Sequence, residues 1–489
     1  MSDQVKNGAS ISRKDYAAPG RLRLPSWRRE ALRTTFWVVP TVLVVLASIL
    51  FVVTYEIDLA AFHHELTLPW WVRTGSADAG RQVLIAIAAA IITTVGVVFS
   101  ITILALTLAS QQFGPRMMRN FIRDLGNQMT LGVFVATFVY SVLALGSITG
   151  QPGGDFVPHL SITVAEGLLL VDLAVLIYFI HHIAKSIQLP EVIAGIARDL
   201  SRAIDAEFPG RVGGNERNRD NRADAAVLAD LLSQPGAVVT AKHSGYLQFV
   251  GYAKLVEIAE SSDAVIRLAY RPGHFVVAHR PLATVWPAHA ADNVATALEK
   301  RHVTGPHRTL TQDPVFAIDQ LVEIAIRALS PAVNDTFTAL TCIDWLSAGL
   351  SEISSRVLDE GVYRDRAGHV RLIEFNPSYA RMVNRSFDKV RQAGRAMPAV
   401  IIRMIDALTY ITEITTSSQQ RNVLIRQAEM IMRGAEEEVP EPNDIADIRV
   451  RYDRLLATTN EIDSEGRAAT SDVNPLSTTT GEPGAVNRK

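Results

Sequence analysis

The chain has 489 residues, 48% of them hydrophobic, and a formal net charge of −2. This length allows two or three domains, and the near-zero charge argues against a nucleic-acid partner. The single cysteine, Cys342, excludes an intramolecular disulfide and any CxxC metal site. The hydrophobic excess lies before residue 190, which indicates a membrane domain followed by a soluble one.

Residues 1–25 are polar and predict a disordered tail, and a group of arginines follows them. Four apolar runs come next, each with the roughly 20 residues that a membrane-spanning helix needs. Arginines crowd the N-terminal collar and the second loop, whereas the first and third loops are poor in Lys and Arg. The positive-inside rule therefore places both termini in the cytoplasm, with the chain in the cytoplasmic (inner) membrane. The predicted spans are 34–54, 82–110, 128–148 and 159–187.

Small and hydroxylated residues recur along the second span at alternating spacings of three and four. In lipid, such a stripe is typical of a seam between closely packed helices. A polar pathway lined by hydroxyls is the alternative, and it requires a homo-oligomer because four spans are few for a monomeric pore. The stripe contains Thr93, Gly96, Ser100, Thr107 and Ser110.

The second span breaks at Gly114-Pro115, and Arg116, Arg119 and Arg123 follow on a short amphipathic segment. Such a segment lies in the headgroup plane with its arginines near lipid phosphates, and the break is a candidate hinge.

The fourth span carries two acids, Glu166 and Asp172, and ends with His181 and His182. Ionisable residues inside a membrane usually face a bundle interior or an aqueous cavity, so the acids are candidates for a polar pathway. The structural alternative is hydrogen bonding to Ser and Thr of the second span. Six residues apart, the acids point to different sides of one helix. The two histidines are expected to contact headgroups or carbonyls at the inner interface.

The remainder of the chain predicts a cytoplasmic α+β domain. Residues 189–236 read as a stalk helix and linker, and 237–290 as a small β-rich barrel or sandwich with one helix. Residues 291–433 read as helices with a hairpin near Ala367-Gly368, and 434–489 as a mostly disordered tail with a helix at 446–457. Fold class is therefore a multi-pass α-helical membrane protein with four transmembrane helices and this domain attached.

A turn, Ser330-Pro331-Ala332-Val333-Asn334-Asp335, separates two of the predicted cytoplasmic helices. Capping and turn chemistry explain Ser330, Pro331, Asn334 and Asp335. The alternative is a site for an anion or a nucleotide phosphate at the start of the second helix.

Several stretches resemble a bacterial family of predicted membrane proteins, domain of unknown function 2254. The likeness rests on 97–124, 177–188, 244–250 (SGYLQFV) and 328–340 (ALSPAVNDTFTAL). Thr336 stands where the family pattern would place proline. The resemblance implies an integral membrane part with a cytoplasmic domain, and no activity, ligand or catalytic residue.

These patterns favour a homo-oligomeric channel or transport protein that is regulated by its cytoplasmic domain and carries an ion or small ligand. The alternative is a membrane-anchored sensor or scaffold whose cytoplasmic domain binds a ligand or protein. An enzyme ranks last, because the sequence has no GxSxG, HExxH or Walker motif and no metal-spaced Cys/His cluster. No cofactor, metal or catalytic residue is predicted, and the expected partners are the lipid bilayer and further copies of the chain.

Overall fold

The computed structural model describes residues 37–471, with gaps at 68, 114–123, 152–153, 209–228, 231–232, 357, 359–360 and 375–376. The predicted N-terminal tail lies outside the described residues. The chain divides into two compact units. One contains Arg219–Arg308 and Glu360–Phe375, and the other contains Val39–Asn218, Thr309–Asp359 and Asn376–Lys489.

Within the described residues, four helices are long and apolar enough to cross a membrane. They are α2 (Val38–Phe62), α3 (Ala77–Phe113), α5 (Leu125–Gly146) and α6 (His159–Ser186). All four predicted apolar runs thus form helices. The first helix ends at Phe62, beyond the predicted end at residue 54. Asp58 is in fact buried within α2.

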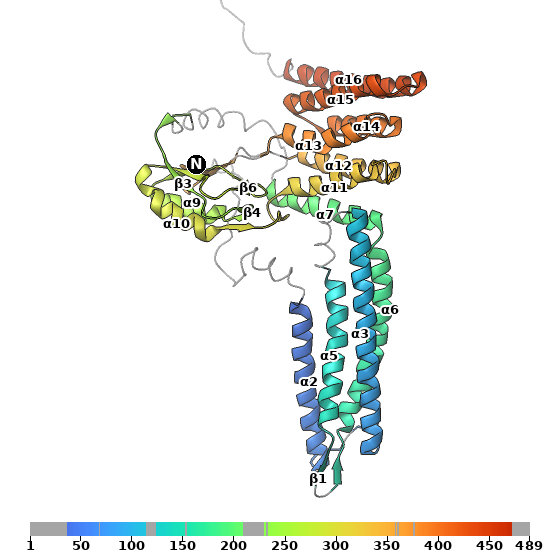
Figure 1. The fold of residues 1–489 in the computed structure, drawn as a ribbon. Coiled ribbons are helices and arrows are strands. Elements are labelled where there is room, and N and C mark those ends of the chain that lie inside the picture. The colour runs from blue at the N-terminus through green and yellow to red at the C-terminus, as the bar shows by residue number, and fades with distance from the viewer. Residues whose placement is uncertain are drawn as a thin grey trace, which may run out of the picture. The chain divides into compact units, whose positions relative to one another are not determined.

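The apolar helices pack around α5, which lies beside both α3 and α6 (Figure 1). A short hairpin of β1 (Thr149–Gln151) and β2 (Gly154–Phe156) joins α5 to α6. The helix α3 has 37 residues, so it extends for roughly 55 Å and exceeds the ~30 Å hydrocarbon thickness. Its buried stripe is apolar and repeats at heptad-like spacing: Leu84, Ile87, Ile91, Val98 and Ala105.

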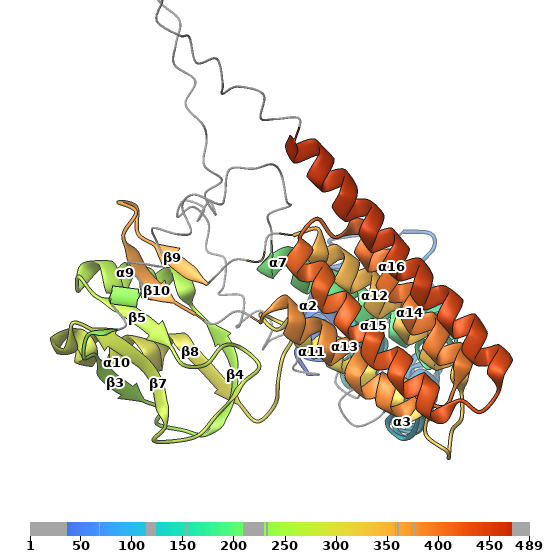
Figure 2. The ribbon, with the colours of Figure 1, turned by 90° about the horizontal axis from the view of Figure 1, so that it is seen from above.

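In the described part of the chain, seven helices after the apolar ones share a second core. Proline near the start of α7, α11 and α14 suits a helix N-terminus, where its missing N–H is not needed. Figure 2 shows α13, α15 and α16 in this group, where α15 packs against both of the others. The helices are α7 (Leu189–Glu207), α11 (Pro314–Ala328), α12 (Thr336–Ser354), α13 (Tyr379–Ala393), α14 (Pro398–Ile414), α15 (Ser418–Glu438) and α16 (Pro442–Ser471).

Two sequence predictions are corrected in this core. The expected stalk, α7, is instead a core helix, because its apolar stripe with Ile196 and Leu200 packs on α11 and α12. The expected disordered tail is helical up to Ser471, because Ile448 and Leu455 of α16 are fully buried against α14 and α15. The sequence of α16 is rich in charged residues, which occupy its exposed face, so its narrow apolar stripe did not predict a buried helix.

The other unit is the β module. A five-stranded sheet has the order β3-β7-β5-β10-β9, and a three-stranded sheet has the order β6-β4-β8. Two helices, α9 and α10, pack on each other and contribute to the core of this module. The elements are β3 (Ala237–Thr240), β4 (Gly245–Val250), α9 (Tyr252–Ser261), β5 (Val265–Leu268), β6 (Phe275–Val276), β7 (Pro281–Trp286), η1 (Ala288–Ala290), α10 (Ala291–Arg301), β8 (His302–Gly305), β9 (Val362–Arg364) and β10 (Val370–Ile373).

The β module is larger than predicted. The hairpin β9–β10 was assigned to the helical region, yet β10 pairs in parallel with β5 and extends its sheet. The strand β8, also beyond the predicted boundary at 290, pairs with β4. A parallel pairing between segments about 100 residues apart leaves no local sequence pattern, so only tertiary structure reveals it.

Candidate site within the apolar helices

The hydroxyl stripe of α3 faces away from the other apolar helices of the chain. Thr93, Ser100 and Thr107 are exposed, and each hydroxyl donates to the carbonyl four residues earlier, at 2.8–2.9 Å. Nothing lies within 4 Å of a Cβ built at Gly96. The side chain of Ser110 lies outside the described residues. The stripe is therefore no seam within one chain, because apolar side chains occupy the buried face, and a seam or pathway between copies stays a prediction.

Asp172 lies half-way along α6 and is buried, with 2% of its surface exposed. Its Oδ1 accepts a hydrogen bond from the Thr137 hydroxyl of α5 at 3.2 Å. Its Oδ2 is shielded from solvent and has no hydrogen-bond partner among the described residues. The expected contact with hydroxyls of the second span is wrong, since the partner comes from the third. The carboxyl group is thus only half satisfied.

More polar side chains continue this site along α5. Asn127, Thr130 and Ser141 are at least 96% buried, at spacings that put them on the same face of α5 as Thr137. Both amide atoms of Asn127 and the hydroxyl oxygens of Thr130 and Ser141 have no partner in the described parts of the chain. With Asp172 they form the α5–α6 polar line. The α5 residues are absent from the predicted site because they carry no charge, although their spacing of three, seven and four is visible in the sequence of the third span.

A second polar cluster is fully hydrogen-bonded. Asp58 of α2 accepts from the backbone N–H groups of Leu160 (2.7 Å) and Ser161 (2.9 Å) and from the Ser161 hydroxyl (2.8 Å). Thr54 joins the Ser161 hydroxyl (3.1 Å) to the Tyr140 hydroxyl (2.8 Å). Because Pro158 offers no side-chain cap to α6, Asp58 supplies that cap from another helix. These contacts hold α2 against α6, and both carboxylate oxygens of Asp58 have protein partners.

Glu166, the other predicted acid, lies apart from the α5–α6 polar line. Its side chain is 27% exposed, and a carboxylate oxygen lies 3.5 Å from a guanidinium nitrogen of Arg73, which is 77% exposed. An exposed ion pair of this kind contributes little to stability. The two candidate acids of the fourth span thus have different partners, Arg73 for Glu166 and Thr137 for Asp172.

The opposite end of α6 holds the predicted histidines. Nε2 of His182 lies 2.7 Å from Oδ2 of Asp124, whose Oδ1 accepts from the N–H of Gly126 and caps α5. His181 is exposed. His182 thus has a carboxylate partner rather than the headgroup or carbonyl contact expected. The candidate hinge residues Gly114, Pro115, Arg116, Arg119 and Arg123 lie outside the described residues.

Comparison with known proteins identifies the family of this chain. A family model described as a predicted membrane protein, DUF2254, matches residues 33–410. The chain belongs to this family. The uncharacterized proteins Rv1290c of Mycobacterium tuberculosis and Mb1321c of Mycobacterium bovis are each 34% identical over 380 residues, which cover 76% of this chain and 71% of the relative. No solved structure matches the chain. The DUF2254 resemblance seen in the sequence is confirmed.

One DUF2254-like stretch contains the turn between α11 and α12. Asp335 caps α12 by accepting from the N–H (3.1 Å) and hydroxyl (2.6 Å) of Thr338. Asn334 has a φ of 50°, a left-handed conformation that Asn tolerates well. The Ser330 hydroxyl donates to the carbonyl of Arg327 at 2.6 Å, and Pro331 is exposed. Capping and turn contacts therefore account for these residues, and an anion site there stays a prediction.

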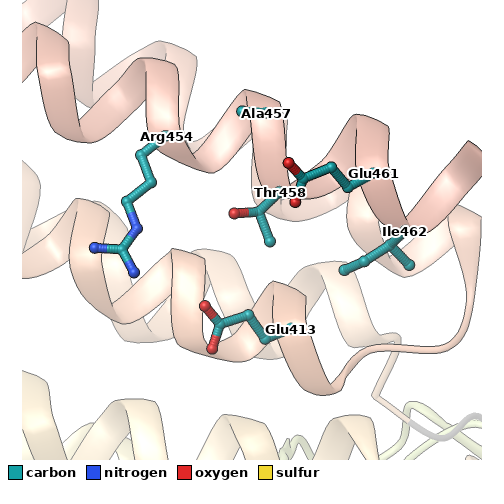
Figure 3. A pocket seen from close by; sticks show the side chains of 6 residues that line it. All are labelled: Glu413, Arg454, Ala457, Thr458, Glu461 and Ile462. Atoms are coloured by element: carbon teal, nitrogen blue, oxygen red, sulfur yellow. The ribbon is translucent and has the colours of Figure 1, made fainter.

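A pocket lies between α14 and α16, beyond the part of the chain that matches DUF2254. Figure 3 shows Arg454 on one side, facing the carboxylate of Glu413, with Glu461 further along α16. Thr458 and Ile462 complete its wall. Its polar lining suits a hydrophilic ligand.

Proposed function

We propose that this DUF2254 protein is an integral membrane transport protein that moves a small ion or hydrophilic solute along the α5–α6 polar line. The observation that carries the proposal is Asp172, an acid buried among apolar helices with one carboxylate oxygen unpartnered among the described residues. Ionisable residues in such positions usually mark ion or proton pathways.

Energetics support a hydrophilic occupant for this line. Five buried atoms of Asn127, Thr130, Ser141 and Asp172 have no partner among the described residues. Leaving a buried polar group unpaired costs ~1–3 kcal/mol, so five amount to roughly 5–15 kcal/mol, as much as the net stability of many proteins. Water or a transported species in the line would satisfy these groups.

Regulation by the C-terminal helices fits the connection between α6 and α7. Only Ile187 and Gln188 separate α6, which carries Asp172, from α7, whose buried face belongs to the C-terminal helical core. A displacement of that core would therefore pull directly on α6. The outward stripe of α3 is the surface we assign to contact between copies in a homo-oligomer, since small residues allow close helix approach.

The test is flux through the full-length protein in liposomes, measured for H⁺, Na⁺, K⁺ and Cl⁻. Asp172→Asn is expected to lower the flux at least tenfold. Glu166→Gln is the matched control, because it removes the same charge from the same helix outside the line, and it should keep flux within about twofold. Ser100→Leu tests the oligomer separately, by cross-linking and by flux. Equal flux in wild type and Asp172→Asn would refute the proposed pathway.

The alternative, a membrane-anchored sensor, is favoured by one observation, the charged pocket between α14 and α16. It predicts no flux for any ion, together with thermal stabilisation by a small hydrophilic ligand. Arg454→Ala should abolish that stabilisation, whereas Asp172→Asn should leave it unchanged.

A further inference from the structure

We infer that the species bound at Asp172 is a proton, which enters and leaves at Oδ2 while the Thr137 hydroxyl holds Oδ1. This inference rests on the proposed transport function and names its substrate. In the binding step, hydronium gives H⁺ to the carboxylate, leaving a neutral carboxylic acid and water. In the release step, water on the other side of the site takes that proton.

The charges around Asp172 support this choice. The whole of α5 has no Asp, Glu, Lys, Arg or His, and its Tyr140 hydroxyl is bonded to Thr54. The charged residues of α3, Asp78 and Arg81, lie in its first two turns and pair with each other. Among the described residues, α3 and α5 therefore place no unpaired cation beside Asp172. The other ionisable groups of α2 and α6 are Tyr55, Glu56, Asp58, His159, Glu166, Tyr178, His181, His182 and Lys185.

These remaining groups are distant or already paired. Along α6, Glu166 lies roughly 9 Å from Asp172 and is paired with Arg73, whereas His182 lies roughly 15 Å away and is paired with Asp124. Each carboxylate oxygen of Asp58 accepts from one of the first N–H groups of α6. An unpaired buried carboxylate is unfavourable, and none of the described residues supplies the positive partner that Asp172 then requires.

Coordination geometry favours a proton over a metal cation. Hard cations such as Ca²⁺ and Mg²⁺ take about six or more oxygen ligands at ~2.0–2.6 Å, and alkali ions likewise need several oxygens. Along α5, Ser141 lies roughly 6 Å from Thr137 and Thr130 roughly 10 Å from it, so these hydroxyls cannot converge on one ion at Oδ2. Among the described residues, no three His, Cys, Asp or Glu side chains form a metal-binding group. A proton needs only the single oxygen.

The other polar residues of α5 provide positions for a relay. From Asn127 to Ser141 the line extends for roughly 21 Å, most of the ~30 Å thickness of a hydrocarbon core. Hydroxyl groups both donate and accept, so Thr130 and Ser141 can hold waters above and below Asp172 in a hydrogen-bonded chain. Both are buried and have unpartnered oxygens within the described region.

The experiment combines a binding readout with a transport readout on the full-length protein in liposomes. Infrared difference spectra between acidic and alkaline pH detect the C=O band of a carboxylic acid that titrates. Many of the 50 Asp and Glu residues titrate over this range, so the readout is the difference between variants. The wild type and Glu166→Gln should share a band that Asp172→Asn lacks. Proton flux, measured with an internal pH dye, should fall to the level of protein-free liposomes in Asp172→Asn. Ser141→Ala should keep the band and lower the flux severalfold.

The outcomes separate this inference from the proposed function. No Asp172-dependent band, with Na⁺ or K⁺ flux that Asp172→Asn abolishes, would overturn the proton and leave transport standing. A titrating Asp172 band without flux of any ion would support the proton site and overturn transport. Absence of both would overturn both.

Discussion

The hydrogen bonds of Asp58 predict a large loss of stability on Asp58→Ala. The carboxylate accepts three hydrogen bonds from the start of α6, at 2.7–2.9 Å, and is 3% exposed. Each lost bond leaves a buried donor unpaired, at ~1–2 kcal/mol apiece, so the substitution should destabilise the α2–α6 contact by roughly 3–6 kcal/mol. Asp58→Asn keeps one acceptor oxygen and should lose about half as much.

The assay is SDS-induced unfolding of the full-length protein, followed by a fluorophore pair on α2 and α6. Glu56→Ala is the matched control, because Glu56 lies on the same helix, is exposed, and should change the unfolding free energy by no more than ~0.5 kcal/mol. A free energy for Asp58→Ala within ~1 kcal/mol of wild type would show that water or another donor–acceptor pair replaces the cap, and would refute the reasoning.

Two further predictions concern titratable groups in the C-terminal region. Burial and the nearby Asp335 carboxylate raise the pKa of Cys342, the single cysteine of the sequence, to about 12. Maleimide should therefore label it on the order of 10³-fold more slowly in the native protein than after SDS denaturation, as measured by mass spectrometry. Labelling of the native protein within minutes would contradict this prediction. Burial lowers the pKa of His302 to about 4, because its Nε2 is shielded and has no partner among the described residues, while Nδ1 donates to the Leu298 carbonyl. The unfolded chain, with a pKa near 6.5, then binds more protons than the folded one below that pH, so the β module should lose about 2 kcal/mol between pH 7 and pH 5. Hydrogen exchange of the β8 amides measures this loss of stability, and His302→Gln should remove its pH dependence. An equal pH dependence in that variant would assign the loss to another titratable group.

The sequence by itself determined most of the helices and strands, although it missed β8 and most of α16. Apolar composition over about 20 residues is a local property, so all four apolar helices were predicted, including the one that carries Asp172. Alternating apolar residues and turn residues likewise located β3 to β7 and the hairpin β9–β10.

Tertiary structure decided which polar groups meet. Asp58 lies outside the predicted first span, which ends at residue 54. It can be buried within α2 because the N-terminus of α6, about 100 positions later, provides hydrogen-bond donors. The hydroxyls of α3 looked like the polar face of the bundle, yet they satisfy their own helix, and the unpartnered groups lie on α5. Periodicity assigns residues to a face of a helix, but the neighbours of that face depend on long-range packing. That packing brings Thr137 to one oxygen of Asp172 and leaves the other oxygen without a partner among the described residues.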